Sequence, residues 1–328
     1  MAAGGAGMTV GAYAAATDTG RKRRRNEDSY VIAPPLFAVA DGMGGAQAGE
    51  IASKLAAVAL EETDLGALSG EERVTSLIQE ANRRVYERSN EDPNASGMGT
   101  TITVALVEDT GVTIGHVGDS RAYRYRDSSI EQITEDHSLV NELMKSGKLS
   151  PEEAETHPQR SVITRALGTD PDVDVDSFIV EAQTGDVFLL CSDGLTTMVG
   201  DDGILAVLDK HHDDLDRATK SLVSAANRGG GEDNITVIAF AISDAGDTAT
   251  MSAVGEDTME NVAAPPAVDT MVIPPDRVEE MFVEPGSPEA QAVMRRDPIS
   301  STARLRLVLT MLVLLVLAAV LLVWGLVR

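Results

Sequence analysis

The sequence LFAVADGMGG, at residues 36–45, joins an apolar run to an aspartate and a glycine-rich turn. Five consecutive apolar residues predict a buried β-strand, and Asp41-Gly42 marks the point where that strand ends. Glycine beside the aspartate allows the backbone and a ligand to approach closely. The combination of an apolar run and an aspartate recurs three times, at Val112–Val117 before Gly118-Asp119-Ser120, at Val187–Cys191 before Ser192-Asp193-Gly194, and, in reverse order, at Asp233-Asn234 before Ile235–Ile242.

These four aspartates lie at strand ends, so antiparallel pairing can bring them to one edge of the sheets. A cluster of carboxylates repels itself unless cations sit among its members. Hard oxygen ligands without His or Cys suit Mg²⁺ or Mn²⁺. A single Asp-Gly pair is explained as well by a turn, but the set at strand ends is more specific. The pattern therefore predicts a divalent metal site.

Residues 9–243 are expected to form one globular domain. Runs 101–108 and 112–117 are joined by Asp109-Thr110-Gly111, which is a hairpin signal, so the sheets should be largely antiparallel. The fold class that follows is α+β, with sheets inside and helices outside. Helical periodicity is seen at 50–62, 71–88, 138–146 and 201–227, the last of which is expected to break into two helices.

The charge balance excludes some classes of protein. With 27 Lys and Arg against 52 Asp and Glu, the formal net charge is −25, which argues against a protein that coats nucleic acid. The one cysteine, Cys191, excludes an internal disulfide framework and a Cys-rich zinc site. Because Cys191 lies inside an apolar strand, it is interpreted as a core residue. Hydrolysis by this chain would therefore use water activated by metal ions.

A basic run, residues 21–25, directly precedes Glu27 and Asp28. Such a run can be a nuclear-localisation or nucleic-acid patch, but here it borders two carboxylates in an acidic domain. An arginine next to a metal–carboxylate site can hold a phosphate with its bidentate fork. Two metal ions about 3.5–4 Å apart would activate water and neutralise the phosphoryl oxygens. The residues thus point to metal-assisted phosphate chemistry.

The motifs together resemble the metal-dependent Ser/Thr protein phosphatases of type 2C, the PPM family, and especially its bacterial membrane-anchored branch. They occur in the family's order across nearly all of residues 9–243. The resemblance implies a four-layer αββα fold, a β-sandwich of two antiparallel sheets flanked by helix pairs, and hydrolysis of phosphoserine and phosphothreonine on proteins. The matching strings are Arg23-x-x-Asn26-Glu27-Asp28-Ser29, Asp41-Gly42-Met43-Gly44-Gly45, Gly99-Thr100-Thr101, Gly118-Asp119-Ser120-Arg121, Asp193-Gly194 and Glu232-Asp233-Asn234-Ile235-Thr236.

The resemblance also implies the ligands of two core metal ions, Mn²⁺ or Mg²⁺. Asp41 would bridge both ions, and Asp193 and Asp233 would complete one of them. Glu27 and the backbone carbonyl of Gly42 would serve the other.

By the same resemblance, Arg23 would grip the substrate phosphate and Asp28 would orient a metal-bound water. Asp119 would join Asp193 at a third, weaker metal site. Ser161 would contribute to that site through a mobile flap, placed by analogy at residues 144–165.

One position departs from the family pattern. Many eukaryotic members have a His, a proposed general acid, where this chain has Met43, so another group must protonate the leaving group. None of the five histidines sits in a motif that names it, and each, His157 included, is expected to be a surface or loop residue.

The apolar run 307–327 contains 21 residues without a charge, which is roughly 30 Å of helix and enough to cross a hydrocarbon core. The alternative, a buried core helix, would be amphipathic. Arg295, Arg296, Arg304 and Arg306 precede the run, so the positive-inside bias places the preceding chain in the cytoplasm. We expect a single-pass anchor at 304–328, no secretory signal, and a catalytic domain at the cytoplasmic face of the cell membrane.

Residues 244–303 read as an acidic, proline-rich, disordered linker. A short unit recurs in it, at 247–251, 256–259 and 268–271, and chance similarity is the alternative explanation. We expect the linker to confine the domain near membrane-bound phosphoproteins. Membrane Ser/Thr kinases and their substrates are expected partners, and the linker threonines, Thr250, Thr258 and Thr270, are candidate phosphorylation sites or passive solvating residues.

Two other functions fit parts of the sequence. A pseudophosphatase would bind phosphoproteins without turnover, but it would lack metal ligands, and here every ligand position in the motifs is filled. A membrane scaffold that recruits partners through its linker could coexist with activity. A phosphatase is therefore the preferred interpretation.

Overall fold

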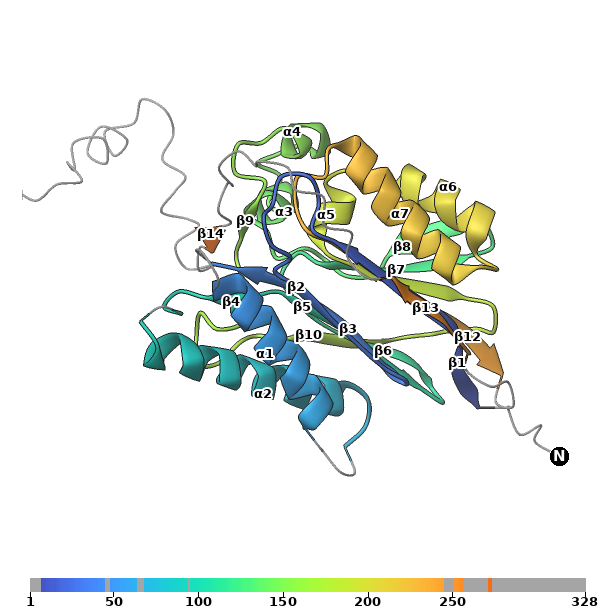
Figure 1. Ribbon diagram of the computed structural model, residues 1–328, viewed down its shortest axis with the longest axis horizontal. Helices are drawn as coiled ribbons and strands as arrows, with labels where there is room; N and C mark the ends of the chain where they lie inside the picture. Colours follow the sequence, from blue (N-terminus) through green and yellow to red (C-terminus); the bar gives the residue numbers. More distant parts are fainter. Residues whose placement is uncertain are drawn as a thin grey trace, which may run out of the picture. The chain divides into compact units, whose positions relative to one another are not determined.

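The computed structural model describes residues 7–44, 48–63, 68–93, 95–244, 250–255 and 271–272. Two β-sheets lie face to face between pairs of helices (Figure 1). The first sheet has the strand order β13-β1-β12-β11-β7-β8. Its strands are β1 (Met8–Asp18), β7 (Arg121–Arg126), β8 (Ser129–Gln132), β11 (Val187–Cys191), β12 (Ile235–Asp244) and β13 (Thr250–Gly255).

The second sheet has the strand order β10-β6-β5-β3-β2, and β4 also pairs with β3. Neighbouring strands are antiparallel throughout both sheets, except that β13 runs parallel to β1. The two antiparallel sheets predicted from the sequence are therefore confirmed. The strands are β2 (Asp28–Ala33), β3 (Leu36–Met43), β4 (Gly99–Thr100), β5 (Ile102–Glu108), β6 (Gly111–Val117) and β10 (Asp176–Val180).

Helices cover the outer face of each sheet (Figure 1). Helices α1 (Ala48–Glu62) and α2 (Gly70–Glu91) pack on the second sheet, and α6 (Asp201–His211) and α7 (Leu215–Gly229) pack on the first. The segment 201–227 does break into two helices, as its periodicity predicts. The shorter elements are α3 (Leu139–Lys145), α4 (Pro151–Glu155), α5 (Asp193–Thr196), β9 (Val162–Ile163) and β14 (Met271–Val272).

Among the described residues, the three large clusters of buried apolar side chains lie one at each interface between layers. Between the sheets, Phe37 of β3 stacks on Phe240 of β12 with ring centroids 4.4 Å apart, which joins the two sheets by apolar contact. Within the first sheet, Phe240 stacks in turn on its register partner Phe188 at 5.4 Å. Strand alternation explains the arrangement, because successive residues of β3, β11 and β12 face the sandwich interior and a helix layer in turn.

Two described strands, β13 and β14, fall within residues 244–303, the predicted linker. Most of that linker and the predicted anchor at 304–328 lie outside the described residues. Among the helices of the described part of the chain, none is both long and apolar enough to span a membrane.

Candidate metal centre and active site

Asp28 and Asp41 are direct neighbours, because they are register partners at the open end of the β2–β3 pair. Asp41 is held by its backbone: its N–H donates to Thr101 Oγ1 at 3.0 Å, and the Thr101 N–H donates to the Asp41 carbonyl at 2.9 Å. The side chain is thereby left to point into the site from a rigid strand end.

Asp193 and Asp233 approach from the first sheet. Asp193 is the first residue of α5, directly after β11, and Asp233 precedes β12. Ser192 ties this sheet to Asp28, since its Oγ donates to Asp28 Oδ2 at 2.8 Å and accepts from the Thr236 N–H at 2.9 Å. The Asp41 and Asp193 carboxylates also lie close enough for the charge of Asp193 to raise the pKa of Asp41. Carboxylates of both sheets therefore meet at one edge of the sandwich, as the strand-end pattern predicts.

Glu27 and Gly42 lie against the start of α1. The Gly42 N–H donates to the Glu27 carbonyl at 3.2 Å. A Cβ added at Gly42 would lie 2.1 Å from the Gly49 carbonyl oxygen, and one at Gly49 would lie 2.5 Å from Glu27 Oε2. Only glycine fits at either position, because backbone and carboxylate approach so closely there. Gly49 is a site residue that sequence reasoning missed.

Asn234 organises the loop that carries Arg23 and Glu27. Its side chain is buried, accepts from the Glu27 N–H at 2.8 Å, and donates to the carbonyls of Thr19 and Arg25 at 2.9 and 2.8 Å. Asn234 is part of one of the matching motifs, but the sequence alone indicated no role for it. It is a positioning residue that holds the loop beside Asp233.

Arg23, and neither of its basic neighbours Arg24 and Arg25, faces the carboxylates. Its Nη2 donates to Asp233 Oδ2 at 2.6 Å, and only a fifth of its side chain is exposed. Arg25 instead forms a 3.5 Å ion pair with Glu50 on α1, and half of its side chain is exposed. The choice of Arg23 as the phosphate ligand is consistent with this geometry.

The carboxylates raise one another's pKa. Burial first, and neighbouring carboxylates second, raise the pKa of Asp28 and of Asp193 to about 7 and hold those of Asp41 and Asp119 well above the usual value. Such a site favours either protons or cations among the oxygens.

The residues fit a hard divalent cation. The donors are oxygens only, and Asp28 Oδ1 and Asp193 Oδ1 are buried with no hydrogen-bond partner among the described residues. Within the part of the chain that the structure describes, no three His, Cys, Asp or Glu side chains are yet close enough to ligate one ion. The carboxylates thus lie at the same edge of the sandwich, but their oxygens are farther apart than in a metal-bound site.

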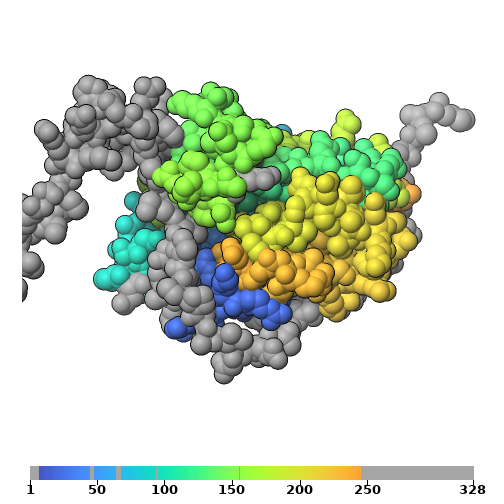
Figure 2. All heavy atoms as spheres, turned by 90° about the horizontal axis from the view of Figure 1, so that it is seen from above, coloured from blue at the N-terminus to red at the C-terminus, as the bar shows by residue number. Residues whose placement is uncertain are grey.

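Asp119 and Ser161 share a hollow with Asp193. This hollow, of about 850 Å³, lies between the end of the β-sandwich and the flap. Figure 2 shows the flap as a separate green lobe beside the helices of the first sheet. The exposed Ser161 and Arg160 line the hollow from the flap side. The three side chains implied for a weaker third site are therefore brought together around one cavity.

The turn that carries Asp119 rests on two buried histidines. His116 is fully buried, with Nδ1 2.9 Å from Thr103 Oγ1 and Nε2 3.1 Å from the Glu135 carbonyl. His137, 8% exposed, accepts from the Gly118 N–H through Nδ1 at 3.0 Å. The expectation that every histidine is a surface or loop residue is wrong for His116, which lies inside β6; His137 does lie in a loop, but it is buried there. The available signal was the apolar run Val112–Val117, in which His116 stands.

Acid is expected to destabilise the fold through His116. Burial, and then the neighbouring His137, lower the pKa of His116 to about 3, so only the unfolded chain binds this proton between pH 6.5 and 3. The stabilisation that neutral His116 gives the folded state is fully present above about pH 6.5, the pKa of histidine in the unfolded chain, and it is lost as the pH falls. From pH 7 to 5 it amounts to about 2 kcal/mol of unfolding free energy.

Urea unfolding of the wild type and of His116→Gln at both pH values checks this. The variant should lose less free energy of unfolding than the wild type on going from pH 7 to 5. The buried aspartates, whose raised pKa values change stability in the opposite direction over this range, affect both proteins equally. Equal pH dependence in the two proteins would contradict the assignment.

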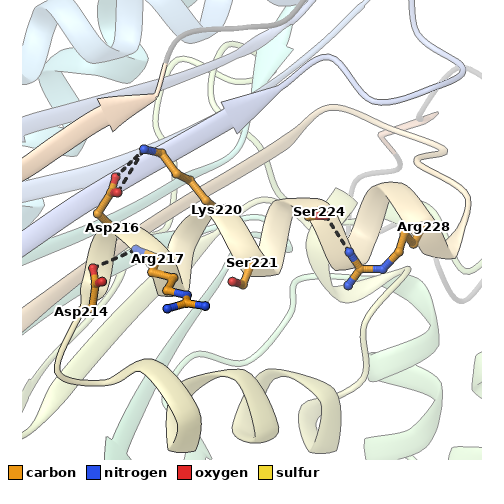
Figure 3. Close-up of a pocket in the computed structure, with 7 residues that line it drawn as sticks. All are labelled: Asp214, Asp216, Arg217, Lys220, Ser221, Ser224 and Arg228. Carbon is orange, nitrogen blue, oxygen red and sulfur yellow. Dashed lines mark hydrogen bonds and ion pairs between the residues drawn. The ribbon is translucent and has the colours of Figure 1, made fainter.

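A second hollow, of about 440 Å³, lies on α7 and shares no lining residue with the first. Its charged groups have local partners, since Lys220 pairs with Asp216 and the Arg228 guanidinium donates to Ser224 (Figure 3). None of the aspartates at the sandwich edge lines it, and we assign it no catalytic part.

Comparisons with known proteins agree with the site. The family model described as Protein phosphatase 2C matches residues 22–227. The serine/threonine phosphatase stp of Listeria monocytogenes serotype 4b is 42% identical over 233 residues, covering 68% of this chain and 92% of that protein. The serine/threonine protein phosphatase PstP of Mycobacterium tuberculosis is 41% identical over 228 residues, but this chain covers only 44% of its length.

Solved structures show the same likeness. The crystal structure of the Mycobacterium tuberculosis phosphatase PstP/Ppp superposes with a TM-score of 0.67 at 39% identity, covering 70% of this chain and 98% of that one. The PstP catalytic domain in complex with two manganese ions gives a TM-score of 0.65 at 36% identity, covering 72% and 100%. With its carboxylate-lined sandwich edge, its ordered motifs and these relatives, the chain belongs to the protein phosphatase 2C family of Ser/Thr protein phosphatases.

Proposed function

We propose that this chain hydrolyses phosphoserine and phosphothreonine on proteins with water activated by two divalent metal ions, at the cytoplasmic face of a membrane. One observation carries the catalytic part: Asp28, Asp41, Asp193 and Asp233 converge at one sandwich edge with Arg23 beside them. The manganese-bound PstP neighbour supports the choice of metal.

Each residue has a chemical task in this proposal. Asp41 lies among the other carboxylates and would touch both ions. Glu27 and the Gly42 carbonyl would hold one ion, and Asp193 and Asp233 the other. Mn²⁺ or Mg²⁺, when bound, supplies the activated water and neutralises the phosphoryl oxygens. Asp28, held by Ser192, would orient the attacking water, and Arg23 would clamp the phosphate.

The leaving group needs a proton that Met43 cannot give. Met43 is instead buried against Ile163 and Ala166 of the flap region. We infer that the proton comes from solvent held in the site, and that Met43 serves packing between the metal loop and the flap.

Phosphate release from a phosphothreonine peptide tests the proposal directly. We expect release in Mn²⁺, restored by Mn²⁺ after treatment with chelator, and none in chelator alone. A pseudophosphatase would bind the peptide in Mn²⁺ without releasing phosphate. Undiminished release in chelator would contradict the metal mechanism.

A third ion at Asp119 is a separate proposal, supported by the hollow that Asp119, Asp193 and Ser161 share. Asp119→Asn should lower phosphate release roughly 10-fold, without abolishing it, and raise the Mn²⁺ concentration needed for half-maximal activity. Asp109→Asn, at the opposite end of β6, is the matched control and should change neither. An unchanged metal titration for Asp119→Asn would mean that this aspartate only closes a turn.

The membrane part rests on the apolar run 307–327 and on Arg304 and Arg306 before it. The full chain should stay in the membrane pellet after carbonate extraction, and a chain ending at residue 303 should be in the supernatant. Such a tether would raise the effective concentration of the domain toward membrane-bound phosphoproteins, including kinases and their substrates. Full release of the complete chain by carbonate would contradict the anchor.

A further inference from the structure

Two strands of the predicted linker pair with the catalytic domain. β13 adds to the edge of the first sheet, parallel to β1, with Tyr13 opposite Met251. β14 adds in parallel to β9, with Met271 opposite Val162 and Val272 opposite Ile163. Met251 and Met271 are also the methionines that end two copies of the repeated linker unit, at 247–251 and 268–271. The repeat therefore coincides with strands that dock on the domain.

β9 lies between the hollow beside Asp119 and the loop that carries Met43. It directly follows Arg160 and Ser161, which line the hollow shared with Asp119 and Asp193. Ile163 is 1% exposed and packs against Met43, two residues after Asp41. A ligand bound along β9 would therefore lie beside the entrance through which a phosphopeptide reaches the site.

β9 has two edges and uses them differently. Ile163 forms an antiparallel bridge to Ser138 on one side, and β14 takes the other side. The second edge would otherwise present backbone N–H and C=O groups without a strand partner, which is the kind of edge to which an extended peptide adds. The pairing is parallel, so a peptide bound at this edge runs in the same direction as β9, with its amino-terminal end toward Ser161.

We propose that this edge of β9 is a binding site for an extended peptide, and that the linker segment Met271–Val272 is its built-in ligand. The segment competes there with the polypeptide of a phosphoprotein substrate.

Tethering explains how so short a strand can bind. Two paired residues give too little free energy for a separate peptide to bind at micromolar concentration, but covalent attachment to the same chain places the segment at roughly millimolar effective concentration. Only residues 256–270 separate β13 from β14. Docking of β13 on β1 thus shortens the tether and favours docking of β14 on β9.

The kinetic consequence rests on the proposed phosphatase function. A site that is about 80% occupied in cis would raise the apparent KM for a phosphopeptide about fivefold without changing kcat. The KM for p-nitrophenyl phosphate, which has no peptide backbone, should be unaffected.

Two matched double variants of the full chain in detergent micelles test the proposal. Met271→Pro with Val272→Pro removes both backbone donors of β14, whichever of them pairs. Met259→Pro with Glu260→Pro makes the same change at the middle copy of the unit, which lies outside the described residues. Hydrogen exchange at Ile163, followed by mass spectrometry, reports docking without any need for turnover, whereas the Val162 N–H already donates to the Gln159 carbonyl.

We expect the first variant to exchange faster at β9 and to show about a fivefold lower KM for the phosphopeptide, and the second to match the wild type. Adding the peptide VDTMVI at millimolar concentration to the first variant should restore protection and raise KM. Equal exchange at β9 in both variants would overturn the proposal. Altered exchange without measurable hydrolysis would leave docking standing and refute the phosphatase function, so the two failures are distinguishable.

Discussion

Asp41→Asn is expected to lower metal-dependent phosphate release by roughly 10³-fold or more, which is about 4 kcal/mol of transition-state stabilisation. Asp41 is the register partner of Asp28, and it is central among the carboxylates because the charges of Asp28, Asp193, Asp233 and Asp119 all raise its pKa. An amide in its place keeps one oxygen ligand but removes the charge that would hold two cations together.

The fold should survive this change. The bonds that hold Asp41 to Thr101 involve the Asp41 backbone and do not depend on its carboxylate. Removing one charge from a group of mutually repelling carboxylates should leave the metal-free protein at least as stable as the wild type.

Calorimetric Mn²⁺ titration, thermal unfolding in chelator and phosphate release would separate these effects. We expect weakened metal binding, an undiminished Tm in chelator and almost no turnover. Asp109→Asn, in the β5–β6 hairpin, is the control and should behave as the wild type. Turnover close to that of the wild type in saturating Mn²⁺ would contradict the two-metal assignment.

Arg23→Ala should raise the KM for a phosphothreonine peptide roughly 10- to 100-fold, with a smaller effect on kcat, because it removes a phosphate ligand that acts in the ground state. Arg23 is mostly buried and 2.6 Å from Asp233, whereas Arg25 is half exposed and pairs with Glu50. Arg25→Ala is therefore the matched control, with an expected change below about twofold.

Metal titration separates phosphate binding from an indirect effect on Asp233. Loss of the Arg23 charge removes a competitor for Asp233, so Mn²⁺ affinity should hold or increase while KM for the peptide rises. Arg23→Lys should recover only part of the loss, since an ammonium lacks the bidentate fork. Similar KM values for Arg23→Ala and Arg25→Ala would show that the phosphate ligand lies elsewhere.

Local sequence was sufficient for much of the fold and for the prediction that aspartates at strand ends gather at one edge of the sandwich. Apolar runs followed by Asp-Gly predicted the ends of β3 and β11, and the hairpin signal at 109–111 predicted the antiparallel β5–β6 pair. The helical periodicity of 201–227 predicted α6 and α7. These features can be predicted because burial of one face of a helix or strand requires apolar residues at regular spacing, and because turns require particular residue types.

Other features depended on partners distant in sequence. β1 is rich in Ala, Gly and Thr, so its own pattern is weak, and its pairing with β12 over residues 8–18 makes it a strand. His116 is buried because Thr103 and the Glu135 carbonyl supply partners for its ring. The task of Asn234 exists only because the loop at residues 19–27 closes over it.

The sequence by itself determined which residue types stand at the strand ends, and hence the kind of metal and the chemistry to expect. The motif resemblance had singled out Arg23, and the structure places it, not Arg25, beside Asp233. Tertiary structure alone decided that two histidines support the Asp119 turn and that Met271 and Val272 pair with β9. The physical reason is that hydrophobic periodicity is recorded along the chain, whereas hydrogen-bond partners and like-charge neighbours are set by contacts between segments more than 200 residues apart.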